Sequence, residues 1–132
     1  MRHILAGLIL VGVCAPSFAA NVIDGSKALL CAPVDSIQCA KSAQCLRGEG
    51  EVINLPNFFK ADPQGKMLSG IQGDERSSPV RHTTTVDGAL VMQGDQNGRA
   101  WSMVVSLETG DMTLTAAADR GAYVVFGVCT PL

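Results

Sequence analysis

The stretch Arg99–Leu107, RAWSMVVSL, decides the fold of this chain. Large apolar side chains occupy every second position, and small or polar residues fill most of the positions between them. A period of two with one apolar face is the pattern of a β-strand that is buried on one side. The face predicted to be buried consists of Trp101, Met103, Val105 and Leu107.

The alternation continues towards the C-terminus. After the turn signal Thr109–Gly110, the segment 112–116, MTLTA, again has an apolar residue at every second position. A further turn at 119–121 leads to the segment 122–129, AYVVFGVC, which is apolar on both faces. This last pattern predicts a strand that is buried on both sides or lies against a neighbouring loop.

Strands and turns also alternate towards the N-terminus. Asp87–Gly88 joins VRHTTTV (80–86) to ALVMQ (89–93), and Asp-Gly between two such runs is a strong signal for a β-hairpin. A four-residue turn is expected at 95–98, and another turn at 62–65 separates two earlier strand candidates.

The chain as a whole reads as strands joined by short turns. No stretch shows a sustained helical period in its apolar residues, and turn signals recur about every ten residues. The sequence therefore predicts an all-β domain of about seven to eight short strands. Short connections favour antiparallel neighbours, so we expect an up-and-down sheet curled into a small barrel or sandwich. The polar segment 73–79, GDERSSP, is expected to be an exposed loop.

Residues 1–19 have the features of a secretory signal peptide. A basic start precedes an apolar segment, 4–13, which is too short to span a bilayer. Small residues then stand at the two positions that a signal peptidase reads, so cleavage is expected after Ala19, or else after Ala20.

A lipoprotein cleavage site at Cys14 is the less favoured alternative, because Val13 before it is not a small residue. The mature chain, 20–132, is expected to be a single β domain. This style of signal peptide is typical of bacteria and predicts a periplasmic or secreted protein.

The charge balance argues against two classes of partner. Removal of Arg2 with the signal peptide lowers the ten basic residues to nine against twelve acidic ones, a net charge of −3. The mature chain has no basic run, which disfavours nucleic acid and anionic membrane surfaces as partners. It also has no apolar segment long enough to be a membrane-spanning helix.

Four of the five cysteines remain after cleavage: Cys31, Cys39, Cys45 and Cys129. An even number of cysteines in an oxidising compartment favours two disulfides. Their spacing is wider than that of a structural zinc site. The mature chain also lacks C-x-x-C and C-x-x-C-H, the motifs of redox centres and of covalent haem attachment. We therefore expect neither a metal nor a cofactor.

Four cysteines allow three pairings. Cys39 and Cys45 bracket a short polar segment, whereas Cys31 and Cys129 lie in the first and last strands, which meet in an up-and-down barrel. The expected disulfides are therefore Cys39–Cys45 and Cys31–Cys129. The alternative that stays open is Cys31–Cys45 together with Cys39–Cys129.

The mature sequence contains no recognisable arrangement of catalytic residues. His82, the only mature histidine, shares a face with apolar residues of its predicted strand and is expected to point inwards. Ser77 and Ser78 lie near it, but neither belongs to a G-x-S-x-G motif. Glu49 and Glu51 would share one face of a strand, and solvated edge carboxylates explain them more simply than a glycosidase pair. We assign no catalytic residue and do not expect an enzyme.

Three aromatic residues are the candidates for binding. Trp101, the sole tryptophan, is expected to be a core anchor, with a ligand-stacking role at the barrel mouth as the alternative. Phe58 and Phe59 are adjacent, so on a strand they face opposite ways and one of them should be buried. The other is a candidate contact for a partner protein.

The segments CAPVDSIQC, INLPNFF, ALVMQG, GRAWSMVVSLETGDMTLT and VVFGVCTP, in this order, resemble a family of small exported proteobacterial proteins that has no assigned function. The resemblance covers most of the mature chain and is most specific at 98–115 and 126–131. It implies an exported, mostly antiparallel β domain with oxidised cysteines. It implies no catalytic residue.

These observations favour an exported, non-catalytic interaction module. We expect it to be a monomer that binds another exported protein or a component of the cell envelope. The alternatives are a carrier that holds a small apolar ligand inside a β-barrel, and a hydrolase of an unrecognised type.

Overall fold

The computed structural model describes residues 22–48 and 54–132, which form an all-β structure. Its strands alternate with short turns, as the period-two pattern predicts. The strands are β1 (Leu29–Ala40), β2 (Leu46–Gly48), β3 (Phe59–Asp62), β4 (Met67–Gly70), β5 (Ser77–Val86), β6 (Ala89–Gln96), β7 (Arg99–Ser106), β8 (Asp111–Ala118) and β9 (Gly121–Pro131).

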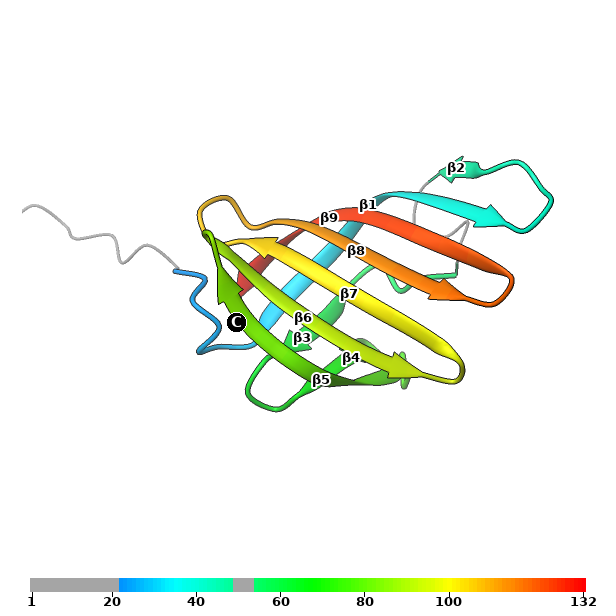
Figure 1. Ribbon diagram of the computed structural model, residues 1–132. Helices are drawn as coiled ribbons and strands as arrows, with labels where there is room; N and C mark the ends of the chain where they lie inside the picture. Colours follow the sequence, from blue (N-terminus) through cyan, green and yellow to red (C-terminus); the bar gives the residue numbers. More distant parts are fainter. Residues whose placement is uncertain (1–21, 49–53) are drawn as a thin grey trace, which may run out of the picture.

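The strands form one antiparallel sheet that closes into a barrel (Figure 1). β3 to β9 pair in chain order, and β1 closes the barrel by pairing with β3 on one side and with β9 on the other. β1 and β9 pair along their whole lengths, from Leu29 opposite Pro131 to Ala40 opposite Gly121. Eight strands make up the barrel, and β2 is an extra strand beside the second half of β1. The predicted small antiparallel barrel is confirmed.

The inward face of β7 carries the centre of the core. Trp101, Met103 and Val105 are buried, as the alternation in this stretch predicts, and Leu107 is partly buried. Neighbouring strands add Met92 and Val125 to the same buried cluster. Ile23, from the segment that leads into β1, is buried in this cluster as well.

Two hairpins of the barrel have two-residue turns with positive φ angles, and the first of them is the predicted Asp-Gly turn. Asp87 and Gly88 join β5 to β6 with positive φ angles of 47° and 77°, which is the combination of a type I′ hairpin turn. Asn97 and Gly98 join β6 to β7 in the same way, with φ of 51° and 74°. This second turn is shorter than the expected 95–98, because β6 extends to Gln96.

Two predictions are wrong in part. Residues 73–76 lie in the expected loop, but Ser77–Pro79, expected to belong to it, form the start of β5 and pair with β4. β9 is not buried on both sides: Val125 and Cys129 face the core, whereas Phe126 and Val128 are exposed. The barrel wall is a single layer, so outward side chains of a strand meet solvent unless another segment covers them.

The two disulfides are Cys31–Cys129 and Cys39–Cys45, which confirms the predicted pairing. Cys31 and Cys129 lie directly opposite each other on β1 and β9, so this bond crosses the seam between the first and last barrel strands. The second bond spans the turn from β1 to β2. Both disulfides are compatible with an oxidising, exported location.

In the described ranges, no helix is long and apolar enough to cross a membrane. The predicted signal peptide, 1–19, lies outside these ranges.

Candidate functional site

Trp101 lies in the barrel interior. Its exposed fraction is only 9%, and its indole Nε1 donates a hydrogen bond of 2.8 Å to the hydroxyl oxygen of Ser78 on β5. The ring therefore has its polar group satisfied inside the protein, as a buried indole requires. This geometry is that of a core anchor, and no face of the ring stands free at the surface for stacking.

Side chains occupy the interior tightly. A methyl group built at Gly127 on β9 would lie 2.7 Å from the terminal methyl of Met112 on β8. Met92, Met103 and Leu90 are almost completely buried around the same axis. These side chains fill the part of the barrel interior that lies against β6 and β7.

Phe58 and Phe59 face opposite ways. Phe59 is buried on β3, and Phe58 just before that strand is 41% exposed. Phe58 is therefore the one of the two that a partner could contact.

His82 does not point inwards, and the prediction that it does is wrong. The pairing of β5 with β6 shifts by one residue between Val80 and His82, which is the signature of a β-bulge. Val80 is buried opposite Gly94, whereas His82 lies opposite Gln93 and is exposed. Because of this extra residue, the side chains after the bulge lie on the opposite face of the sheet from the one that simple alternation predicts. The sequence pattern does not reveal the bulge.

The other catalytic candidates are two serines and two glutamates. The hydroxyl of Ser78 is engaged by Trp101, and Ser77 is exposed at the start of β5. Glu49 and Glu51 lie outside the described residues. Within ranges 22–48 and 54–132, no group of three or more His, Cys, Asp or Glu residues could hold a metal ion.

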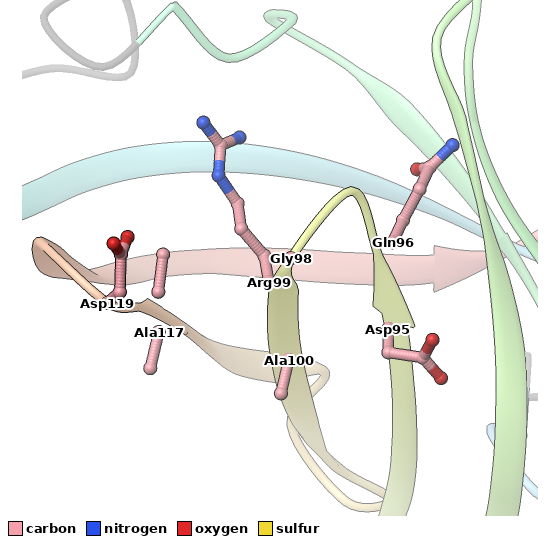
Figure 2. A pocket seen from close by; sticks show the side chains of 8 residues that line it. Asp95, Gln96, Gly98, Arg99, Ala100, Ala117 and Asp119 are labelled. Carbon is pink, nitrogen blue, oxygen red and sulfur yellow. The ribbon is translucent and has the colours of Figure 1, made fainter.

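A shallow depression of about 440 Å³ lies at the barrel rim, beside the β6–β7 and β8–β9 turns. Figure 2 shows Gln96 and Arg99 pointing to the same side of the β6–β7 hairpin, while Asp95 points away from them. The guanidinium of Arg99 lies 5.7 Å from the ring centroid of Tyr123, a cation–π distance. Because the depression is wide open and its lining mixes acidic, basic and small residues, it offers no enclosed site for a small molecule.

Two ion pairs fasten a loop and the extra strand β2. Arg76 donates to both carboxylate oxygens of Asp74 and to the backbone carbonyl of Asn54, so it ties the β4–β5 loop to the segment before β3. The hydrogen bonds that Asp74 accepts from the Arg76 side chain, together with one from the backbone N–H of Arg76, lower the pKa of Asp74 to about 2. Arg47 on β2 pairs in the same manner with Asp35 on β1 and lowers the pKa of that carboxyl. Both pairs fasten the structure and leave neither carboxylate poised for acid–base chemistry.

The outer side of the barrel carries exposed apolar side chains on β7, β9 and β1. Val104 on β7, Phe126 and Val128 on β9, and Val34 on β1 are between 38% and 61% exposed. We call these four residues the outer apolar face. Large aliphatic and aromatic side chains grouped on a surface are typical of sites that bind another macromolecule.

The strand register places these residues together. Val104 lies opposite Thr113 on β8, and Thr113 lies opposite Phe126, so the three form one row across the barrel wall. Val128 is two residues from Phe126 on the same side of β9. Val34 lies in the irregular part of β1, next to Asp35, which is the partner of Phe126. In the sequence, the signal for this face is the apolar character of both faces of segment 122–129, which by itself predicts burial on both sides.

No protein-family model matches the sequence, and searches of curated proteins and of solved structures gave no significant match. Membership of the exported family that the sequence resembles therefore stays a prediction.

Proposed function

We propose that this protein is an exported, non-catalytic interaction module that binds another exported protein or an envelope component through its outer apolar face. The observation that carries the proposal is the exposure of Val104 on β7 and of Phe126 and Val128 on β9, on the same side of a closed barrel and separated only by β8.

The surroundings of this face suit a protein interface. Val104, Thr113 and Phe126 form an uncharged row, and the carboxylates beside the face are Asp35, directly opposite Phe126, and Asp111, directly opposite Val128. Interfaces are depleted of charge at their centres, with polar groups around the rim. The face is also rigid, because Cys129, next to Val128, is tied to β1 by a disulfide.

The interior supports this proposal over that of a ligand carrier. Trp101 and the surrounding methionines and aliphatic residues are packed in the space that a carrier would leave for its ligand. A carrier of this size needs a cavity that encloses most of its ligand.

The test is affinity capture from periplasmic and secreted extracts, with the oxidised protein as bait. The double variant Phe126→Ser/Val128→Thr removes the apolar surface while keeping exposed strand positions, and Leu46→Ser is the matched control because Leu46 is also an exposed apolar residue, on β2. We expect a protein or envelope fragment that the wild type and the control retain and that the double variant loses.

Two results would overturn the proposal. Equal capture by the wild type and the double variant would show that the outer apolar face is not the binding surface. A lipid or other apolar molecule found by native mass spectrometry in the purified protein, with no captured partner, would favour the carrier.

A further inference from the structure

β5 extends beyond the end of β4, its neighbour on one side. β4 pairs only with Ser77–Pro79, and the last backbone hydrogen bond on that side runs from the N–H of Val80 to the carbonyl of Lys66. Of the next six residues, Arg81 is the extra residue of the bulge, and His82–Val86 pair with β6 alone. In the described part of the chain, no strand pairs with their other side, which we call the open edge.

The turn between β5 and β6 determines which backbone groups face the open edge. In a two-residue hairpin the residues that flank the turn, here Val86 and Ala89, form a hydrogen-bonded pair. Alternate residues then bond to β6, which leaves the N–H and C=O groups of Thr83 and Thr85 directed outwards. The side chains of Arg81–Val86 are all exposed, so nothing in the described chain covers this edge. Unpaired edges of this kind are ready to pair with another strand.

We propose that two copies of this chain associate through the open edge, in antiparallel pairing about a two-fold axis at Thr84. In this arrangement Thr83 of each copy forms a hydrogen-bonded pair with Thr85 of the other. The inference departs from the monomer expected from the sequence. It does not depend on the proposed function, because it uses a different surface.

The charge pattern of the open edge is complementary to itself, which favours a second copy of this chain as the strand that pairs with it. The segment 81–87, RHTTTVD, has a cation at one end, an anion at the other and three uncharged threonines between them. Antiparallel pairing about Thr84 brings Arg81 of each copy beside Asp87 of the other, whereas parallel pairing would bring like charges together. Arg81 also pairs with Asp95 at 3.1 Å, and a guanidinium has donors for both carboxylates.

The bulge limits the length of the interface. Between Val80 and His82 the strand changes register and twist, so an added strand can follow the edge only over Arg81–Val86. A two-fold interface uses each edge once, so the assembly closes as a dimer and does not grow into a fibre. Threonine is also among the residues that favour strands, which suits the centre of such a pair.

The test is sedimentation velocity of the oxidised protein over a dilution series, with two variants that differ by one residue. Thr83→Lys/Thr85→Lys places lysine opposite lysine in the dimer, and Thr83→Lys/Thr85→Glu places lysine opposite glutamate. We expect a reversible dimer for the wild type, at least tenfold weaker association for the first variant, and association restored in the second. A wild type that stays monomeric up to millimolar concentration, or equal weakening in both variants, would overturn the inference.

Cross-linking tests the axis independently of affinity. Thr84→Cys brings two cysteines together across the axis in a non-hydrogen-bonded pair, where Cα atoms lie about 4.5 Å apart, within disulfide range. Thr83→Cys is the control, since its two copies lie diagonally apart. We expect a covalent dimer from Thr84→Cys alone, with the bond between the two introduced cysteines. A dimer that the Phe126→Ser/Val128→Thr variant abolishes would show that the outer apolar face forms the contact and would contradict the proposal.

Discussion

Gly94 on β6 lies directly opposite Trp101 on β7, and the indole ring covers the glycine. A methyl group at position 94 would lie 2.6 Å from Cε2 of Trp101 and closer still to the carbonyl oxygen of Pro79. Glycine is therefore required here by packing and not by a turn. An aromatic ring over a glycine on the neighbouring strand also restores the contacts that the missing side chain would have made.

Replacement of Gly94 by alanine should lower the free energy of unfolding by about 1–3 kcal/mol, the usual cost of forcing an extra methyl group into a packed core. Urea unfolding measures the loss. The double variant Gly94→Ala/Trp101→Phe has a smaller ring at the contact, so its loss should be less than the sum of the two single losses. Strictly additive losses would show that the ring and the glycine are not in contact.

Trp101 should behave as a buried chromophore. Its fluorescence should be blue-shifted and poorly quenched by iodide, because the ring is enclosed and its N–H is bonded to Ser78. Trp101→Ala should cost about 3–5 kcal/mol of stability. Ser78→Ala should cost about 1–3 kcal/mol, because it leaves the indole N–H without an acceptor. Ready quenching together with a small loss in Trp101→Ala would place the ring at the surface.

The two disulfides should differ in their contribution to stability. Cys31–Cys129 closes a loop with a sequence separation of 98 residues, and Cys39–Cys45 closes one of 6 residues. Chain entropy predicts losses of about 4–5 kcal/mol for Cys31→Ser/Cys129→Ser and about 2 kcal/mol for Cys39→Ser/Cys45→Ser. Thermal unfolding of both double variants measures the difference, and non-reducing peptide mapping checks the pairing. A peptide in which Cys39 is linked to Cys129 would contradict the structure.

Asp74 should titrate at an unusually low pH. Hydrogen bonds from Arg76 lower its pKa to about 2 from the ordinary 3.8. Because the pKa is lower in the folded state, the pair's stabilisation is fully present above about pH 4 and is lost as the pH falls towards 2. NMR titration of the carboxyl carbon measures the value. Arg76→Gln should raise it towards 3.8, and the control Lys60→Gln, which removes a contact to Asp62, should leave it unchanged.

Local patterns predicted the β7 strand, the Asp87–Gly88 turn and the all-β class. Each depends only on residues that are close in the sequence. Apolar residues at every second position indicate a strand with one buried face, and Asp-Gly favours a turn with positive φ. The pairing of Cys31 with Cys129 followed from one further step, that the first and last strands of an up-and-down barrel are neighbours.

Two predictions from local patterns were wrong: that His82 points inwards, and that β9 is buried on both sides. A bulge adds one residue to β5 relative to β6, and only the register of the two strands reveals it. For β9, apolar residues on both faces indicated burial on both sides, but no described segment covers Phe126 and Val128. Burial depends on what packs against a strand, and its own residues do not contain that information.

By itself, the sequence determined the strand pattern, the tight turns and the expected pairing of the cysteines, because side-chain alternation and turn preferences act between residues near one another in the chain. Only the tertiary structure decided that Trp101 fills the interior above Gly94, that Val104 and Phe126 share one row on the outside, and that β5 extends beyond β4. These three features depend on strand register and on the lengths of neighbouring strands. Both are determined when the barrel closes, since each barrel strand must match at least two partners at once.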